Sequence, residues 1–486
     1  MEAVAPPLPA DTWDALPSEV QMFILDLQAQ AVAFRMENGA LQERIRELEG
    51  RLRQDSSNSS RPPSSDPPQA TKQRQATPTG RKRGGQPGHP GAFRSLLPVE
   101  QVDEVVVVVP EHCRRCQQPL PSTEDRRRTR VWRHQVVELL PLAVRVTEYQ
   151  MEVRRCGQCG TRTRATLPAG VPLRPFGPRL TAVVALLSGR YRLSRREVQQ
   201  ALVDLWNVTL SLGAVLRHER VQSAALAPVV AEVRAAVQQA AVVNVDETGW
   251  RQEQRRAWLW TAVTPSLTAF LIDRSRGGTA LEALLGEQFA GLVGSDRWSV
   301  YGRFPAERRA LCYAHLKRDF QALVDRGGEA EPVGRWGVAE LERLFTLWHR
   351  YRAGEFDRKA LQRRLVPVQA RMGRLVWRGE ASPDRKAAAL CHSLDRWWAA
   401  LWTFARVEGV EPTNNVAERA LRAAVLWRKG SFGSDSEAGS RFAERMLTVA
   451  ATCRQQGRRL LDLLVAAGEA AVQGAAAPSL LPTAHG

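Results

Sequence analysis

Long apolar runs are missing from this sequence. No stretch approaches the roughly 18 residues that a membrane-spanning helix needs, although 44% of the residues are hydrophobic. The first residues, MEAVAPPLPADTWDALPSEV, also lack the basic start and the apolar stretch of a signal peptide. We therefore expect a cytoplasmic protein without a membrane partner. Since 486 residues are too many for one core, we also expect several domains.

Acidic residues are in the minority. The chain has 69 Lys and Arg residues against 51 Asp and Glu residues, which gives a formal charge of +18. This excess favours a polyanion as partner, and it favours nucleic acid over a membrane surface because no basic amphipathic helix stands out. A basic surface without a specific ligand is the alternative.

Cysteines are few and odd in number: there are seven, and four of them form two C-x-x-C pairs. In a chain without a secretion signal, this pattern indicates metal ligands rather than disulfides. The pairs lie within residues 101–165, where VDEVVVVVP and the alternating stretch 147–154 predict strands. Two such turns joined by strands are typical of a zinc ribbon, in which the metal supplies much of the folding energy. The predicted structural Zn²⁺ ligands are Cys113, Cys116, Cys156 and Cys159, with His112 as a less favoured substitute.

The N-terminal part carries a heptad pattern. From Ile24 to Leu52 the apolar positions are spaced alternately three and four residues apart, which predicts a coiled coil over residues 21–53. A single Asn at an a position, here Asn38, fixes the register of parallel dimers. Arg44 at g can meet Glu49 at e of the partner helix. We expect a homodimer or a higher oligomer, and an amphipathic helix packed on its own protein is the alternative.

Residues 54–100 differ sharply in composition. SSNSSRPPSSDPP is rich in Ser and Pro, and TKQRQATPTGRKRGGQPGHPGAFR contains no acid. Such a segment cannot bury enough apolar surface to order itself, so we expect a disordered basic linker. Arg81, Lys82 and Arg83 are candidates for contact with nucleic-acid phosphates, and a plain solvated linker is the alternative.

Residues 175–235 have a helical period. Ser194 precedes a predicted helix, REVQQALVDLW, as its cap, and a second helix begins at Leu212 after a short break. Two helices around a tight turn fit a helix-turn-helix-like DNA-binding module, and ordinary packed helices give the same pattern. The second helix carries three candidate DNA-contacting side chains, Arg217, His218 and Arg220.

From residue 240 onward the pattern changes to strands. AAVVNVDETGW, AWLWTAV and SLTAFLID predict three strands, TALEALLGE predicts a helix, and GLVGSD predicts a fourth strand. This order, with acids at the ends of the first and fourth strands, is that of an RNase H-like fold. Because those two strands are neighbours in that topology, we expect Asp246 and Asp296 to lie side by side.

Neighbouring carboxylates indicate a cation. Two of them repel each other and raise one pKa unless a positive charge offsets them. Mg²⁺ is the natural ion because it prefers oxygen and binds through few carboxylates plus substrate phosphate. A third carboxylate on a later helix would complete a two-metal site, in which the ions clamp the entering and leaving oxygens of a phosphodiester.

The chain between the second acid and the last part of this core is longer than such a fold requires. Residues 324–406 predict a helical, Trp-rich insertion, whose Trp side chains belong mostly to its core, with one or two free to stack on an unpaired base. The overall prediction is a multidomain α+β protein. Its catalytic core comprises residues 240–323 and then 407–460 with the C-terminal helices, and residues 461–486 form a tail.

Seven motifs follow one another along the chain: SSNSSRPPSSDPP, KRGGQPGHPG, the paired C-x-x-C, VDETGW, SDRWSVY, CYAHLKRDF and TNNVAERALR. In this ordered set the sequence resembles the insertion-sequence-sixty-six family of bacterial DDE transposases. The motifs span roughly Leu41 to Gly457, most of the chain. The resemblance implies that Asp246, Asp296 and Glu418 are the catalytic, metal-binding triad.

Each member of this triad has a plainer alternative, and for Asp296 it is an acid in an ordinary turn. Glu247 stands next to Asp246 and is a possible ligand in its place. Glu418 lies four residues before Arg422, which suits an ordinary helical ion pair. The helix that carries Glu418 is expected to be capped by Asn414 and Asn415.

The resemblance implies a protein that binds the terminal inverted repeats of an insertion sequence and a target DNA, both double-stranded, in association with the nucleoid. With two Mg²⁺ ions, for which Mn²⁺ can substitute, it would cut the element's end and join the freed 3′-hydroxyl to target DNA. Companion proteins of the same element are further possible partners. A DNA-binding regulator without catalysis and a nuclease that only cuts are the rival hypotheses. Further candidates near the site are His315, as an active-site neighbour, and Arg419, Arg422, Arg428 and Lys429, as DNA contacts.

Overall fold

The computed structural model describes residues 9–52, 54–55, 58, 95–120, 132–139 and 143–482. The chain divides into two compact units, one of residues Thr71–Thr147 and one of Met1–Ala70 with Glu148–Gly486. Arg81, Lys82 and Arg83 lie outside the described residues. Across the described ranges, no helix combines the length and the apolar character needed to cross a membrane.

The unit of residues 71–147 contains little regular structure in its described part. It has a short 3-10 helix, η2 (Val99–Gln101), and a turn at Cys113. The predicted strand VDEVVVVVP is not paired within the described residues, and Val105–Val109 are exposed. Five consecutive valines present apolar side chains on both faces, so such a strand needs cover on both sides, which the described part of this unit does not provide.

The N-terminal segment of the other unit is helical as predicted. It comprises α1 (Ala10–Asp14) and α2 (Ser18–Leu52). Leu27, Phe34 and Leu41, at d positions of the heptad, are 48%, 64% and 54% exposed. The apolar seam of α2 is therefore uncovered by the described residues of this chain, and its pairing in a coiled coil stays a prediction.

A helical module follows a short hairpin of β1 (Val153–Arg155) and β2 (Arg162–Arg164). It consists of α4 (Pro178–Ala185), a short π-helix η4 (Leu186–Arg190), α5 (Arg195–Trp206) and α6 (Leu212–Gln238). The predicted cap of α5 is confirmed, because Ser194 and Glu197 form a reciprocal capping box. His218 is buried, with its Nδ1 3.0 Å from the Thr181 hydroxyl, so it packs inside the module instead of facing a ligand.

The core of the protein is a mixed sheet of five strands. They are β3 (Val242–Gln252), β4 (Arg255–Val263), β5 (Thr268–Asp273), β6 (Leu292–Ser295) and β7 (Arg309–Leu311), in the order β5-β4-β3-β6-β7. The first three form an antiparallel meander, whereas β6 runs parallel to β3 and β7 runs parallel to β6. The predicted neighbourhood of the first and fourth strands is therefore confirmed.

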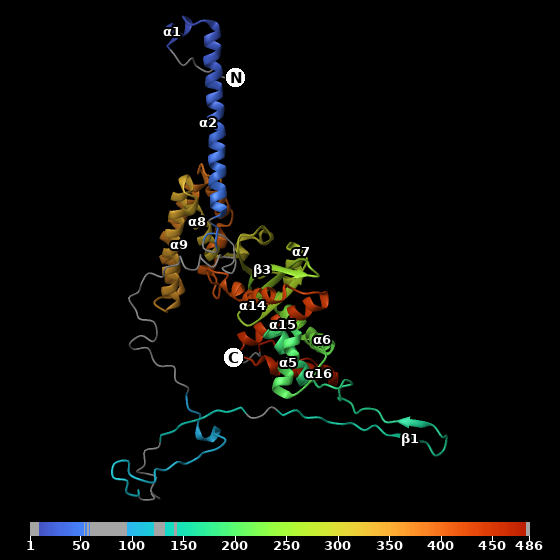
Figure 1. Cartoon of the computed structure of the whole chain (residues 1–486). Helices are drawn as coiled ribbons and strands as arrows, with labels where there is room; N and C mark the ends of the chain where they lie inside the picture. Colours follow the sequence, from blue (N-terminus) through green and yellow to red (C-terminus); the bar gives the residue numbers. More distant parts are fainter. Residues whose placement is uncertain are drawn as a thin grey trace. The chain divides into compact units, whose positions relative to one another are not determined.

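Helices cover both faces of this sheet. On one face, α6 and α7 (Gly278–Leu285) bury Val243 and Val245 of β3. On the other, α14 (Asn415–Ser431) and α15 (Glu437–Gln455) pack on Trp250 and Leu259 (Figure 1). The period of two in β3 thus divides its side chains between two cores.

Helix α15 also protects the outer edge of β5. The backbone N–H groups of Thr268, Phe270 and Ile272 donate, at 3.0–3.1 Å, to three side chains of α15: Thr452, Thr448 and Glu444. These acceptors are four residues apart and so share one face of the helix. The edge strand therefore has its free donors satisfied within the chain.

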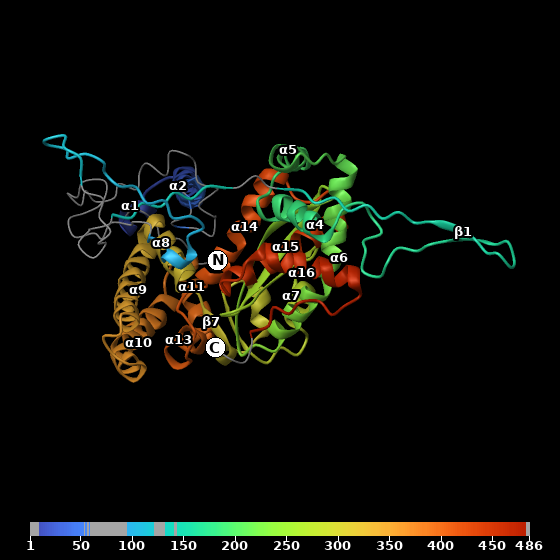
Figure 2. The same cartoon turned by 90° about the horizontal axis from the view of Figure 1, so that it is seen from below.

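The predicted insertion is helical. Two 3-10 turns, η5 (Ser299–Arg303) and η6 (Ala306–Arg308), lead to β7, and η7 (Gly328–Ala330) follows the first helix. The helices are α8 (Tyr313–Arg326), α9 (Glu331–Arg352), α10 (Arg358–Glu380), α11 (Arg385–Arg396), α12 (Trp398–Leu401) and α13 (Thr403–Arg406), with α9 and α10 side by side (Figure 2). Trp348 and Trp402 are buried as expected, whereas Trp377 is 73% exposed.

The C-terminal segment corrects the prediction of a tail over residues 461–486. Its first half is α16 (Leu460–Gln473), which packs on α4 and α6 through Leu463, Leu464 and Ala467. Leu480, beyond this helix, is also fully buried. The small side chains of α16 permit close helix packing.

Candidate active site

Asp246 lies within β3, and Asp296 directly follows the neighbouring strand β6. In the parallel pair β3–β6, Val242 is opposite Leu292 and Asn244 is opposite Gly294. Continuing this register by two residues places Asp246 opposite Asp296. The Asn244 side chain lies over Gly294, where a Cβ atom would clash with it. The glycine two residues before Asp296 therefore leaves room for this side chain.

Glu418 reaches the same region from the first turn of α14. Asn414 occupies the predicted N-cap position, but its side chain makes no capping bond. Its amide instead donates to the carbonyl of Val245 at 2.8 Å, and its backbone N–H donates to Cys312 Sγ at 3.1 Å. The buried bond to the Val245 carbonyl ties the start of α14 to β3 beside Asp246. The motif TNNVAERALR alone did not reveal this connection.

Asp246 lies within the electrostatic influence of the other two carboxylates. The pKa of Asp246 is raised well above its ordinary value, first by burial and then by the negative charges of Glu247, Asp296 and Glu418. A cluster of this kind is destabilised when all its members are ionised, unless a cation is present. Oxygen donors with surplus negative charge suit a hard divalent ion. The donor set therefore fits Mg²⁺ or Mn²⁺.

Glu247, the alternative to Asp246, points to the other face of the sheet. Its Oε2 accepts a hydrogen bond from the Tyr301 hydroxyl at 2.6 Å, and its Oε1 pairs with Arg276 at 2.9 Å. Burial is the main cause of its raised pKa. Because both oxygens already have partners, the geometry favours Asp246 as the ligand, and the assignment of the ligand remains a prediction.

Asp296 is held in place by hydrogen bonds to its side chain and to its backbone carbonyl. The N–H of Trp298 donates to Asp296 Oδ1 at 2.9 Å, and Arg309 donates to the Asp296 carbonyl at 2.8 Å. Arg309 is almost completely buried, and its guanidinium lies 4.4 Å from the centre of the Trp397 ring. The sequence did not point to Arg309, since an arginine in a strand gives no signal that its side chain will bond the backbone of a nearby acid.

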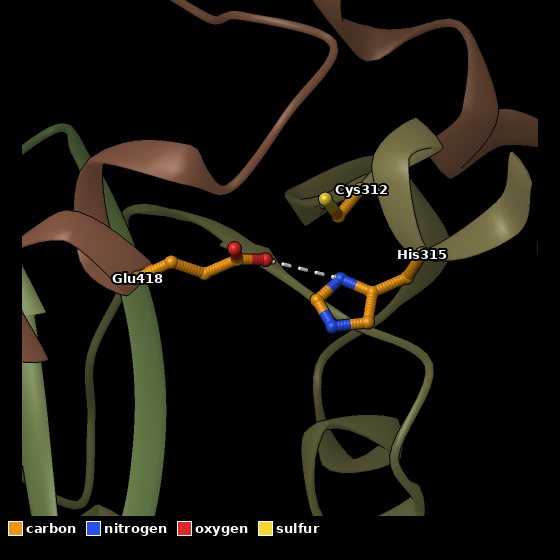
Figure 3. Close-up of side chains that lie close together, drawn as sticks. All are labelled: Cys312, His315 and Glu418. Carbon is orange, nitrogen blue, oxygen red and sulfur yellow. Dashed lines mark ion pairs between the residues drawn. The ribbon is translucent and has the colours of Figure 1, made fainter. Parts of the chain in front are cut away.

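Glu418 has a second set of neighbours on α8. Figure 3 shows its carboxylate extending toward His315, with Cys312 close by, and Oε1 lies 3.6 Å from His315 Nδ1. The Arg318 guanidinium lies 3.4 Å from the same oxygen. The structure thus brings His315 beside the predicted triad, and Glu418 pairs with α8 instead of Arg422. One donor atom from each of Cys312, His315 and Glu418 lies within 4.8 Å of the others.

This second cluster fits a supporting role better than a separate metal centre. Burial raises the pKa of the Cys312 thiol to about 11, so the thiol is protonated at neutral pH. Burial also lowers the pKa of His315, and the charge of Arg318 lowers it further. Since Arg318 already offsets the Glu418 charge at 3.4 Å, we interpret this cluster as the surroundings of Glu418 and not as a separate metal centre.

The predicted DNA contacts divide into two groups. Arg419, Arg422 and Lys429 are exposed on α14, and Arg217 and Arg220 are exposed on α6. Arg428 differs from them, because its guanidinium bonds the Gly249 carbonyl and lies 3.3 Å from the Thr248 hydroxyl. Burial lowers its pKa. Arg428 therefore joins α14 to β3 and is not a free surface cation.

Each predicted zinc-binding turn has the same local geometry. The N–H of Cys113 donates to the Gln118 carbonyl at 2.8 Å, and the N–H of Cys156 donates to the Thr161 carbonyl at 2.9 Å. The residues four positions after each first cysteine, Gln117 and Gly160, have φ of 57° and 72°. The two turns belong to different units of the chain, and a shared zinc ion stays a prediction.

Contacts within these turns also favour the thiolate form. The pKa of Cys113 is lowered, chiefly by the backbone N–H of Cys116. The Thr161 side chain is the main cause that lowers the pKa of Cys159 to about 7. Thiolates are the form of cysteine that binds zinc.

Comparison with known proteins bears on the region that contains the three carboxylates. The profile of the Transposase IS66 family matches residues 174–442, which is more than half of the chain. The chain belongs to this family. The match to the Transposase IS66 family includes β3, β6 and the helix of Glu418. Residues 11–95 match a second profile, described as a family of unknown function (DUF6444).

Two proteins of Sinorhizobium fredii (strain NBRC 101917 / NGR234) are similar in sequence to this chain. Uncharacterized protein y4hP is 25% identical over 363 residues, which cover 66% of this chain and 64% of the relative. Uncharacterized protein y4qI is 26% identical over 234 residues, which cover 43% of this chain and 42% of the relative. The matched region thus spans less than two thirds of either relative.

Proposed function

We propose that this protein is a DDE transposase that cuts the ends of an insertion sequence and joins them to target DNA. The proposal rests on the position of Asp246 in β3, Asp296 directly after β6 and Glu418 in α14, where the charges of Asp296 and Glu418 contribute to the raised pKa of Asp246. The strand order β5-β4-β3-β6-β7, with β4 antiparallel, supports an RNase H-like core. Membership in the Transposase IS66 family supports a transposase role.

The three carboxylates would hold two divalent ions, Mg²⁺ or Mn²⁺. When bound, such ions supply Lewis-acid stabilisation to the entering and leaving oxygens of a phosphodiester. The chain's own residues place the ligands. Asn414 fixes the helix of Glu418 against β3, and Arg309 supports the backbone of Asp296. His315 and Arg318 orient the Glu418 side chain.

The reaction consists of two in-line displacements at phosphorus. In the first, a water oxygen bonds to the phosphate at the element's end and the 3′ oxygen leaves, taking a proton to become a hydroxyl. In the second, that 3′-hydroxyl attacks a target phosphodiester, loses its proton, and displaces another 3′ oxygen. The protein forms no covalent bond to DNA, so it needs no nucleophilic Tyr or Ser.

The remaining modules would bind and pair the DNA ends. The zinc turns, the basic linker and the α5–α6 module would contact the terminal repeats, and α2 would join two copies of the chain. A DNA-binding regulator without catalysis is the alternative from another class. The negative charges of Asp296 and Glu418 near Asp246 favour the enzyme, because a regulator has no use for their repulsion.

The test uses the full chain with labelled element-end DNA, a target plasmid and Mg²⁺. We expect cleavage and strand transfer by the unmodified protein and at least a hundredfold loss of both in Asp246→Asn, Asp296→Asn and Glu418→Gln. Glu342→Gln, which changes an exposed acid on α9, is the matched control and should retain activity. Binding without cleavage by the unmodified protein would support the regulator, and cleavage without joining would support a nuclease.

A further inference from the structure

The outer face of α14 carries a stripe of exposed side chains that starts beside Glu418. Arg419, Arg422, Leu426 and Lys429 are exposed and are spaced three, four and three residues apart. They therefore lie along one side of the helix. The opposite side is buried against the sheet through Ala417, Ala420, Leu421 and Ala424. The sheet fixes the direction of this basic stripe.

Phe432 stands at the far end of the stripe in an unusual state. It is the residue that ends α14, its φ is 59°, and it is 77% exposed. A bulky side chain in the left-handed region costs free energy, and an exposed aromatic ring recovers little of it by burial. Glycine would serve better if the position only had to end a helix.

The residues after Phe432 explain how this conformation is maintained. Gly433 has φ of 117°, and a Cβ atom there would clash with the Arg251 carbonyl. The N–H of Ser434 donates to that carbonyl at 2.9 Å, and the Trp250 indole donates to the Ser434 hydroxyl at 3.2 Å. The ring is thus presented from a segment bonded directly to β3.

The hairpin bonded to the segment after Phe432 is basic, whereas Asp435 and Glu437, which follow Phe432 in the chain, are exposed acids. The end of the β3–β4 hairpin, which bonds Ser434, exposes Arg251, Arg255 and Arg256. The acid in this hairpin, Glu253, pairs with Arg274 at 2.6 Å, so its charge is offset. An exposed aromatic ring among arginines suits a partner with negative charge and flat apolar faces, which are the properties of a nucleic-acid strand.

We propose that Phe432 stacks on a base that has left its pair in the element-end DNA, while the stripe of α14 contacts the phosphates of the same strand. This inference rests on the proposed function. Glu418 and Phe432 are fourteen residues apart, which is about 21 Å along a helix. A strand with one nucleotide per roughly 3.4 Å would cover this distance in about six nucleotides. The stacked base therefore lies about six nucleotides from the phosphate that is cut.

The test combines variants of Phe432 with an abasic scan of the DNA. The full chain is titrated against end DNA in which each nucleotide near the cleavage site is made abasic in turn. For the unmodified protein we expect one position, about six nucleotides from the cut, where base removal weakens binding roughly tenfold. Phe432→Ala should bind intact DNA about tenfold more weakly and lose sensitivity to that position, whereas Phe432→Trp should keep both. Val366→Ala removes another exposed apolar side chain, on α10, and should behave like the unmodified protein.

Phe432→Gly separates a functional ring from a structural one. Its melting temperature should equal or exceed that of the unmodified protein because the left-handed strain is removed, while its binding weakens as in Phe432→Ala. Equal abasic penalties in the unmodified protein and Phe432→Ala would overturn the inference, as would a lower melting temperature of Phe432→Gly. Failure of the unmodified protein to bind end DNA would instead overturn the proposed function.

Discussion

At the scale of single residues, the site depends on side chains that support the carboxylates from behind. Asn414 is the clearest of them. It is 2% exposed and its amide satisfies the Val245 carbonyl immediately before Asp246. The pattern TNN predicted a helix cap at this point, and an Asn before a helix usually acts as one. Only the neighbouring strand, 169 positions away in the sequence, gives this side chain its actual partner.

Asn414→Ala should therefore lower both stability and activity. Removing the amide leaves a buried carbonyl without this donor, which costs about 1–3 kcal/mol of unfolding free energy. The looser attachment of α14 should also weaken Mn²⁺ binding and slow cleavage several-fold. Denaturant unfolding and Mn²⁺ titration measure the two effects. Asn415→Ala, one position later, is the control, and equal losses in both variants would contradict the role of the Asn414 bond.

Arg428 is a single side chain whose predicted role differs from the one it has in the structure. Its position near the end of a basic helix predicts a DNA contact, as for Lys429. In the structure its guanidinium bonds a strand carbonyl, whereas Lys429 is exposed. Sequence gives the charge of these neighbours, but the side of the helix that meets the sheet decides which side chain is drawn into the packing with β3.

At the scale of elements, local patterns predicted the N-terminal helix and most helices and strands of residues 178–460 well. The period of α2, the cap of α5 and the three strands of the meander all follow from spacing and residue type. Within the described residues the valine run 105–109 has no paired strand, and strand formation depends on a partner that a local pattern cannot supply. Helix α16 lies within the predicted tail, and its packing on α4 and α6 could not be predicted from a local pattern.

The zinc-binding turns provide a test at this scale. We expect one Zn²⁺ ion per chain, whose removal by a chelator unfolds residues 101–165, since so small a module has little core of its own. Metal analysis and proteolysis before and after chelation measure this. Cys156→Ser should lose the ion. Cys453→Ala, which removes a buried thiol in α15, should keep it. A chelated protein with unchanged protection of these residues would rule out a structural zinc.

At the scale of the whole molecule, α2 bears on assembly. The described residues leave its d positions uncovered, and a second copy of the helix is the partner that the heptad predicts. Leu41→Asp should convert the protein from a dimer or higher oligomer to a monomer in sedimentation equilibrium and abolish pairing of two DNA ends. Met36→Asp is the matched control, because Met36 is 72% exposed but lies at an f position outside the seam. Loss of the oligomer in both variants, or in neither, would contradict the coiled coil.

The sequence by itself determined the residue types of the candidate site, the order of strands and helices, and the membership suggested by the ordered motifs. These are properties of local spacing and chemistry, which a chain carries in one dimension. Tertiary structure decided which face each acid occupies, so that Asp246 meets Asp296 and Glu418 while Glu247 meets Tyr301 and Arg276. It also decided that Asn414 bonds a strand and that Phe432 is exposed in a strained conformation. Such facts depend on contacts between residues far apart in the chain, and their free energy is gained only when the sheet and its helices pack together.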